Sequence, residues 1–205
     1  MKSGFKAVSD FIADKYLIDS EKVYNDLLSI FFKHGRGRVF DLFFQLRGIP
    51  KEDNIIKELV KIYRYDNKCT MKLYNGVKTL FDYLRKKNKD IAILTDTNWQ
   101  VQKRKVESLG LNKLVDEVYY SDKMSLKKPA SKLYETILKD FKVRPNQTVW
   151  VGDDPTCDFE VPNSIGGITV RLKNGRLKDL SSTLAKDGKY QFTAFYELNS
   201  FIMQQ

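Results

Sequence analysis

Cysteine is scarce in this sequence of 205 residues, which contains only Cys69 and Cys157. Two cysteines do not make a disulfide framework, and they suit a reducing compartment. No apolar run reaches the roughly 18 residues that are needed to cross a bilayer. Residues 1–10 also lack the basic start and the apolar stretch of a secretion signal. These absences predict a cytoplasmic location and no membrane association.

Acidic residues are also in the minority, because 36 lysines and arginines outnumber 26 aspartates and glutamates and give a formal net charge of +10. Such a charge attracts anions, including phosphorylated metabolites, nucleic acids and acidic membranes. The lysines are spread along the chain, and the densest cluster, residues 85–89, falls where a helix should end. Cations at that position suit the helix dipole. We therefore interpret the charge as a solvated basic surface and not as a nucleic-acid-binding patch.

Residues 5–65 show only helical periodicity. Apolar residues recur at helical spacing in four runs, and the third of these, over residues 39–46, is the most apolar. Gly48 ends the third run, and Pro50, at a first helical position, is predicted to open the fourth helix. Four helices without an intervening strand predict a small bundle over residues 1–70.

The pattern changes near residue 70. Short apolar runs over residues 91–94, 118–120, 148–151 and 168–170 then alternate with helical segments. Alternating strands and helices predict a parallel sheet with helices on both faces. Ligands of such sheets bind beyond the carboxyl ends of the strands, so the residues that follow each apolar run are candidates for a site.

The first candidate is the tetrapeptide Thr95-Asp96-Thr97-Asn98, which directly follows the apolar run 91–94. A hydroxyl group and backbone N–H groups at the start of a helix can hold a phosphate. A simpler interpretation is that Thr97 or Asn98 caps the next helix. Taken alone, this motif favours the simpler interpretation.

The second candidate is Lys127-Lys128-Pro129, in the loop before a helix near residue 133. Proline fixes the entry to the helix, and a lysine held there could neutralise a phosphoryl group or an attacking carboxylate. A pair of lysines is more often an ordinary piece of surface, so this motif is also weak alone.

The third candidate is the acidic loop over residues 152–158, which follows the apolar run 148–151. Asp153, Asp154 and Asp158 crowd this loop, and such like charges repel unless a cation lies among them. Carboxylate oxygens at a strand end suit Mg²⁺. An acidic turn that caps the next helix is the alternative, but capping needs one aspartate and not three. The loop therefore favours a metal site.

Together, in this order and spacing, the three motifs resemble those of the haloacid-dehalogenase (HAD) superfamily. Thr95 is similar to the second motif of that family, Lys128 followed by Pro129 to the third, and the loop 152–158 to the acidic fourth. The helical region is similar to the cap of many members. The resemblance covers essentially the whole chain, and it implies an α/β fold: a HAD-like (Rossmannoid) parallel-sheet core over residues 71–205 with a helical-bundle cap over residues 1–70.

The resemblance also implies an activity, the hydrolysis of a small phosphorylated metabolite through a phospho-aspartyl intermediate with Mg²⁺ as cofactor. Lys128 and Thr95 would be catalytic. The resemblance further implies phosphoryl-binding residues Thr95, Asp96, Thr97 and Lys128, and metal-binding residues Asp153, Asp154 and Asp158.

One family motif does not occur in residues 1–205. It has the form Asp-x-Asp-x-Thr/Val, ends the first and central strand of the sheet, and carries the nucleophile. We therefore expect that the strand between runs 91–94 and 148–151 is missing and that the chain is inactive as it stands. Three explanations remain open: a longer native protein, a partner segment that supplies the strand, or direct pairing of the two flanking strands. A non-catalytic HAD-like module that binds a ligand or a partner is the alternative function.

Overall fold

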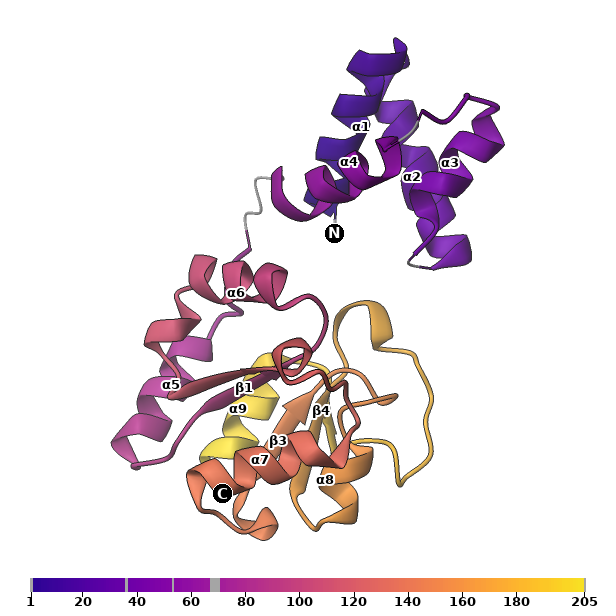
Figure 1. Ribbon diagram of the computed structural model, residues 1–205. Coiled ribbons are helices and arrows are strands. Elements are labelled where there is room, and N and C mark those ends of the chain that lie inside the picture. Colours follow the sequence, from indigo (N-terminus) through magenta and orange to yellow (C-terminus); the bar gives the residue numbers. More distant parts are fainter. Residues whose placement is uncertain (1, 36, 53, 67–70, 205) are drawn as a thin grey trace. The chain divides into compact units, whose positions relative to one another are not determined.

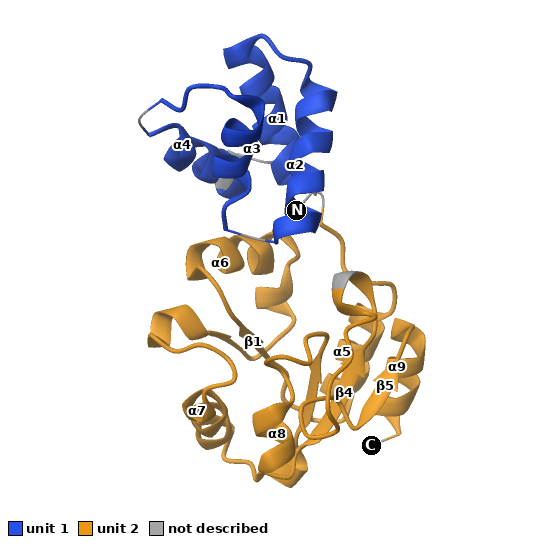
Figure 2. Ribbon diagram, turned by 90° about the vertical axis from the view of Figure 1, so that its right-hand side faces the viewer, with its two compact units in different colours: residues 1–70 blue, residues 71–205 orange. Residues whose placement is uncertain are grey.

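The computed structural model (Figure 1) describes residues 2–35, 37–52, 54–66 and 71–204, and Cys69 lies outside these ranges. The chain forms two compact units, residues 1–70 (unit 1) and 71–205 (unit 2), which Figure 2 colours separately. In the described ranges, no helix combines the length and the apolar character that a membrane span requires. The cytoplasmic location stays a prediction.

Unit 1 is a bundle of helices. Its elements are α1 (Lys2–Tyr16), α2 (Ser20–His34), α3 (Val39–Arg47), α4 (Ile55–Lys61) and the π-helical turn η1 (Ile62–Asp66). Aromatic rings fill its core, where the ring centroid of Phe5 lies 5.6 Å from that of Phe31, 6.4 Å from Phe40 and 5.0 Å from Tyr63. The four predicted helices therefore pack through the apolar positions that predicted them.

The prediction that Pro50 opens the fourth helix was wrong. α4 begins at Ile55, after Asn54, which has a left-handed backbone with φ of 70°. Residues 51–54 are all polar, so a helix that began at Pro50 would present no apolar side chain from its first turn to the core. The first apolar residue after Ile49 is Ile55, which is 2% exposed, and the helix begins with it.

Unit 2 alternates strands and helices. Its α-helices and strands are α5 (Val77–Lys86), β1 (Ala92–Thr95), α6 (Trp99–Ser108), β2 (Glu117–Tyr120), α7 (Ser131–Phe141), β3 (Val149–Gly152), α8 (Glu160–Ser164), β4 (Ile168–Leu172), β5 (Tyr190–Phe192) and α9 (Phe195–Met203). Short 3₁₀ turns lie between them: η2 (Leu111–Lys113), η3 (Ser121–Met124), η4 (Pro145–Gln147) and η5 (Gly175–Leu177). All four predicted strands are confirmed, and β5 was not predicted.

The strands form two separate parallel sheets instead of the one that was predicted. β1 pairs with β2, and β3 pairs with β4, which also pairs with β5. Direct pairing of the strands at 91–94 and 148–151, one of the three explanations above, does not occur. Within the described residues, β1 pairs only with β2, and β3 pairs only with β4.

Helices cover the two faces of the larger sheet. Apolar residues of α5 and α9 pack with Val170 of β4 in one core cluster. Leu133 and Tyr134 of α7 pack with Val161 of α8 in another. Figure 2 shows α5 and α9 on one side of β4 and β5, with α7 and α8 on the other. The second cluster also includes Leu94 of β1 and Trp150 of β3, so apolar packing joins the two sheets where strand pairing does not.

A buried ion pair anchors the connection between β4 and β5. Arg171 of β4, 1% exposed, donates to Asp187 at 2.7 Å and to the carbonyl oxygens of Leu177 and Leu180 at 2.8 and 2.9 Å. Three acceptors bind the two terminal nitrogens of a guanidinium that would otherwise be costly to bury, while its buried Nε has no hydrogen-bond partner among the described residues. Because Arg171 pairs in register with Gly152, this anchor supports the strand that leads into the acidic loop.

Asp187→Asn tests the anchor, because it leaves the guanidinium of Arg171 buried without its counter-charge. We expect the free energy of unfolding to fall by about 3 to 5 kcal/mol. Both tryptophans of the chain lie in unit 2, so tryptophan fluorescence during urea unfolding follows this unit.

The matched control is Asp179→Asn. Asp179 pairs with Lys178 at 3.9 Å, and 87% and 60% of these two side chains are exposed. We expect this variant to change the free energy of unfolding by about 0.5 kcal/mol or less. Equal losses in the two variants would show that the buried pair does not anchor the sheet.

Candidate functional site

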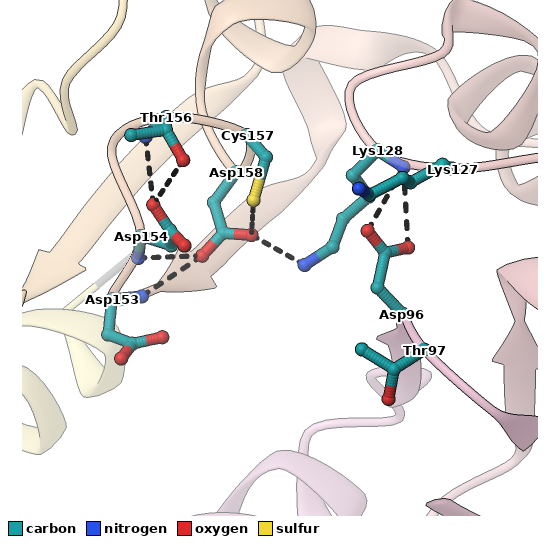
Figure 3. Close-up of a pocket in the computed structure, with 9 residues that line it drawn as sticks. All are labelled: Asp96, Thr97, Lys127, Lys128, Asp153, Asp154, Thr156, Cys157 and Asp158. Atoms are coloured by element: carbon teal, nitrogen blue, oxygen red, sulfur yellow. Dashed lines mark hydrogen bonds and ion pairs between the residues drawn. The ribbon is translucent and has the colours of Figure 1, made fainter. Parts of the chain in front are cut away.

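A pocket of about 460 Å³ lies where the loops after β1 and β3 meet (Figure 3). Loops at the carboxyl ends of parallel strands are where open α/β sheets bind ligands. The residues that line the pocket come from the three predicted motifs: Asp96, Thr97, Lys127, Lys128, Asp153, Asp154, Thr156, Cys157 and Asp158. The sequence motifs therefore converge on one site.

Lys128 bridges the loops that follow β1 and β3. Its backbone N–H donates to the carboxylate of Asp96 at 3.1 and 3.3 Å, and its Nζ donates to Oδ1 of Asp158 at 2.5 Å. Burial by itself would lower the pKa of Lys128, but the Asp158 carboxylate outweighs it and raises the pKa above its ordinary value of 10.5. The side chain is therefore a firmly held ammonium group at the pocket wall.

The acidic loop is built around Asp158. Its Oδ2 accepts the backbone N–H groups of Asp153 at 3.1 Å and Asp154 at 2.9 Å. A Cβ atom at Gly152 would lie 2.7 Å from Cγ of Asp158, which is closer than van der Waals contact allows. Glycine at this position is thus required for the loop to fold back over the Asp158 carboxylate. The oxygens of this carboxylate accept hydrogen bonds from Lys128 and from the backbone of the loop itself.

The other two carboxylates have different surroundings. Oδ1 of Asp154 accepts the N–H of Thr156 at 3.0 Å and its hydroxyl at 2.6 Å. Asp153 is exposed at the pocket wall, yet partial burial of its carboxylate, followed by the charges of Asp158 and Asp154, raises its pKa. A raised pKa under these causes means that the carboxylate lies among negative charge that Lys128 offsets only in part.

These residues fit a divalent cation only partly. Among the described residues, no three His, Cys, Asp or Glu side chains are arranged so that they could hold a metal ion. One or two carboxylates suffice where a cation such as Mg²⁺ keeps several waters or takes oxygens from a substrate phosphate. Asp153, exposed at the pocket wall, could offer such oxygens. Asp154 already accepts from Thr156, and Asp158 accepts from Lys128 and from two backbone N–H groups.

The tetrapeptide Thr95-Asp96-Thr97-Asn98 caps the next helix and also borders the pocket, whereas its binding of a phosphate stays a prediction. Asn98 caps α6, because its Oδ1 accepts the N–H of Val101 at 3.2 Å. Thr97 lines the pocket with φ of 75°, a conformation that is costly for a β-branched residue. Its hydroxyl oxygen accepts from Gln102 at 2.7 Å. Thr95, the last residue of β1, is not among the residues that line the pocket, and its role in binding a phosphoryl group stays a prediction.

Sequence reasoning assigned no role in the site to Lys127, Thr156 or Cys157, although all three line the pocket. Their only signal was their position beside the motif residues. Burial, followed by the charge of Asp158, raises the pKa of the Cys157 thiol to about 12, and its Sγ lies 3.6 Å from Oδ1 of Asp158. The thiol is therefore protonated at neutral pH and is a poor nucleophile.

Comparison with known proteins gives three related findings. A family model described as haloacid dehalogenase-like hydrolase matches residues 37–168. The glyceraldehyde 3-phosphate phosphatase of Pyrococcus furiosus is 27% identical over 194 residues, which are 94% of this chain and 81% of that protein. The ribulose-1,5-bisphosphate 5-phosphatase of Halopiger xanaduensis is 35% identical over 100 residues, which are 49% of this chain and 42% of that protein.

A solved structure supports the fold. The putative β-phosphoglucomutase of Thermotoga maritima superposes with a TM-score of 0.72, covering 98% of this chain and 91% of that chain at 16% sequence identity. At this level of identity, the likeness shows a shared fold. The residues that the family model matches include Thr95, Lys128 and the acidic loop, so the matched region contains the whole pocket.

Lys128→Met tests the bridge between the two loops. It leaves Asp158, whose side chain is 11% exposed, without a cation, and at pH 7 we expect a loss of about 3 kcal/mol in the free energy of unfolding. Because the pKa of Lys128 is raised in the folded state, its charge stabilises the fold below pH 10.5, and this contribution is lost as the pH rises through the raised pKa. Urea unfolding at pH 7 and at pH 11 measures both effects.

Lys127→Met is the matched control, because Lys127 is the neighbouring residue and is exposed. We expect it to change the free energy of unfolding by about 0.5 kcal/mol or less at either pH. A difference between wild type and Lys128→Met that stays constant from pH 7 to pH 11 would contradict the assignment of this stability to the ammonium charge.

Proposed function

Because the chain belongs to the haloacid dehalogenase-like hydrolases, we propose that it forms the cap and the core of a phosphatase that hydrolyses a small phosphorylated metabolite. The observation that carries this proposal is the pocket, which unites the Lys128 ammonium, the acidic loop and the turn after β1 at the carboxyl ends of two strands. The names of the relatives, which are phosphatases of small sugar phosphates, support the same substrate class.

The reaction requires a nucleophile that residues 1–205 do not contain in the family pattern. We propose that a segment outside these residues supplies an aspartate at the end of an added strand. Its carboxylate oxygen attacks phosphorus, the bond from phosphorus to the ester oxygen breaks, and the leaving alkoxide takes a proton from a nearby carboxylic acid. Water then attacks the phospho-aspartyl group, which releases inorganic phosphate and restores the carboxylate.

The residues of this chain would bind and orient the phosphoryl group. The Lys128 ammonium would offset the negative charge that develops on the phosphoryl oxygens, and Asp158 would hold that ammonium in place. The N–H groups of Asp96 and Thr97 and the hydroxyl of Thr95 would donate to the same oxygens. The helical unit 1 would serve as the cap that the resemblance implies.

We further propose that Mg²⁺ is the cofactor, held by Asp153 and Asp154, with Asp158 in a supporting position. A bound Mg²⁺ would neutralise charge on the phosphoryl group and on the carboxylates. The raised pKa of Asp153 supports this assignment, because partial burial and then the charges of Asp158 and Asp154 disfavour its ionised form, which a bound cation would stabilise. The contacts of Asp158 with Lys128 argue that it positions the loop instead of binding metal directly.

The activity can be tested with two forms of the protein. We expect residues 1–205 with Mg²⁺ to give no more than trace hydrolysis of p-nitrophenyl phosphate. A form extended ahead of residue 1 by an apolar strand that ends in Asp-x-Asp-x-Thr should hydrolyse this compound and a panel of small phosphates that includes glyceraldehyde 3-phosphate. Release of inorganic phosphate is the measurement.

Variants of the extended form identify the residues responsible. Asp153→Asn and Lys128→Met should each lower kcat by about a hundredfold or more, since each removes a charge that acts on the phosphoryl group. Lys132→Met, at a lysine whose side chain is 72% exposed, should leave activity unchanged. An extended form without activity would favour a non-catalytic module, and robust turnover by residues 1–205 that Asp153→Asn abolishes would refute the need for an added nucleophile.

A further inference from the structure

The side chains that line the pocket after β1 and β3 are almost all polar. Of the described residues at its wall, four are aspartates, two are threonines, two are lysines and one is Cys157. Pockets for small molecules are ordinarily lined predominantly by hydrophobic and aromatic side chains. A ligand of this pocket must therefore be bound through charges and hydrogen bonds, and this includes the part of the ligand that is not a phosphoryl group.

The pocket has room for more than a phosphoryl group. Its volume of about 460 Å³ lies within the range of roughly 300–1,000 Å³ that is typical of small-molecule sites. In the proposed function, the phosphoryl group lies between Lys128 and the acidic loop. The remaining volume would then hold the group from which phosphate is released.

The two lysines of the pocket differ in what their ammonium groups bind. Nζ of Lys128 donates to Asp158 at 2.5 Å, and these two side chains are only 16% and 11% exposed. Lys127 is exposed at the pocket wall, and within the described ranges its ammonium group has no ion-pair partner and no hydrogen-bond acceptor. One cationic side chain of the pocket is thus already neutralised, and the other is available to an anion.

The two ammonium groups also act on different parts of the pocket. Burial and neighbouring carboxylates raise the pKa of Asp153 and of the Cys157 thiol, and the lysine that opposes both rises is Lys128. Coulombic interactions weaken with distance, so the ammonium group of Lys127 lies farther from the acidic loop. A phosphoryl group held between Lys128 and this loop would leave Lys127 beside the rest of the substrate.

The backbone is held on both sides of the Lys127 side chain. The carbonyl oxygen of Lys127 accepts the N–H of Ala130 at 2.9 Å, and the N–H of the next residue, Lys128, donates to the carboxylate of Asp96. The backbone of Lys127 is therefore fixed at the pocket wall. Only the side chain has to be ordered when an anion binds, which keeps the entropic cost of binding small.

We propose that Lys127 is a specificity-determining residue that binds a second anionic group of the substrate, either a carboxylate or a second phosphate. The inference rests on the proposed function, because it names the substrate class of the same site: a phosphate monoester whose leaving group also carries a negative charge. It adds no chemical step to the hydrolysis described above, and binding can be measured without any catalysis.

Three phosphate monoesters of equal chain length isolate the second charge: 3-hydroxypropyl phosphate, 3-(phosphonooxy)propanoate and propane-1,3-diyl bisphosphate. At the end away from the phosphoryl group they carry an alcohol, a carboxylate and a second phosphate. Isothermal titration calorimetry of residues 1–205 with each compound, at one Mg²⁺ concentration, measures the dissociation constants. We expect both anionic compounds to bind at least about fivefold more tightly than the alcohol, because hydrogen bonds between charged groups are the stronger ones.

Variants of Lys127 test whether this residue causes the preference. Lys127→Met should weaken binding of the two anionic compounds at least about fivefold and leave binding of the alcohol unchanged. Lys127→Arg, which keeps the charge, should keep the preference. Chelation of Mg²⁺ by a compound in solution is the same for every variant, so ratios between variants report on the protein.

Lys132→Met is the matched control, because it removes one positive charge from a side chain that is 72% exposed. It measures the general loss of attraction for anions, which salt screens at an exposed site, and we expect a change of about twofold or less for each compound. Circular dichroism melting shows whether each variant remains folded. A loss in Lys127→Met that is confined to one anionic compound would support the proposal and identify the anion.

Four results would overturn the proposal: equal weakening of all three compounds in Lys127→Met, a preference that survives this substitution, no preference in the unaltered chain, or no binding of any compound. Hydrolysis separates this proposal from the proposed function. An inactive extended form together with charge-selective binding would refute the phosphatase and leave the role of Lys127 standing. Equal values of kcat/KM for the three compounds in an active extended form would refute the role of Lys127 alone.

Discussion

The two contacts of Lys128 hold the candidate site together. The two sheets of unit 2 share no strand pairing within the described residues. At the pocket they are connected by Lys128, which forms hydrogen bonds to the loop that follows β1 and to the loop that follows β3. Its backbone N–H binds Asp96 after β1, and its ammonium binds Asp158 after β3. Farther back, Leu94 and Trp150 share an apolar cluster with Tyr134 of α7. The geometry of the pocket thus depends on a polar bridge at its mouth and on apolar packing behind it.

This bridge also sets the electrostatics of the pocket. Lys128 neutralises Asp158, which in turn fixes the backbone of the acidic loop through the N–H groups of Asp153 and Asp154. Asp153 lies exposed at the pocket wall, and partial burial of its carboxylate, followed by the charges of Asp158 and Asp154, raises its pKa. The cation proposed above would stabilise the charged form of this carboxylate, so the proposed metal site follows from how the loop is folded.

The sequence predicted those parts of the fold that depend on local pattern. The strands β1 to β4 are short apolar runs between helices, and the pocket residues stand directly after such runs, so their convergence followed from the rule for parallel sheets. β5 was not predicted from the sequence, because two of its three residues are exposed and the strand therefore has no apolar run. The fourth helix was predicted to begin too early, because proline is tolerated at a first helical position but does not by itself start a helix. The apolar residues that this helix must bury begin only at Ile55.

The sequence predicted a missing strand between β1 and β3 but could not decide whether these two strands pair directly, which the structure shows they do not. Periodicity reports which face of an element is apolar, but it says nothing of which backbone groups find a partner across a sheet. The contacts of Asp96 and Asp158 were likewise invisible, since a carboxylate that binds Lys128 and one that binds metal have the same letter in the sequence. The structure shows that Asp158 binds Lys128 and the backbone of the loop, whereas Asp153 lies exposed at the pocket wall.

The open edges and the pocket are two results of one arrangement. Parallel strands bring their carboxyl ends to the same side, and Lys128 can bridge the loops after β1 and β3 only because both strands point toward it. Within the part of the chain that the structure describes, the same alignment leaves the outer backbone groups of Leu94 and Val151 without a strand partner, on two edges that run in the same direction. Exposed apolar edges of this kind are a liability for aggregation, and a chain that keeps them apolar, with alanine, leucine and valine instead of lysine or proline, is suited to having them covered. An added strand would then satisfy the edges and reach the pocket at the same time, because the direction that permits the first requires the second.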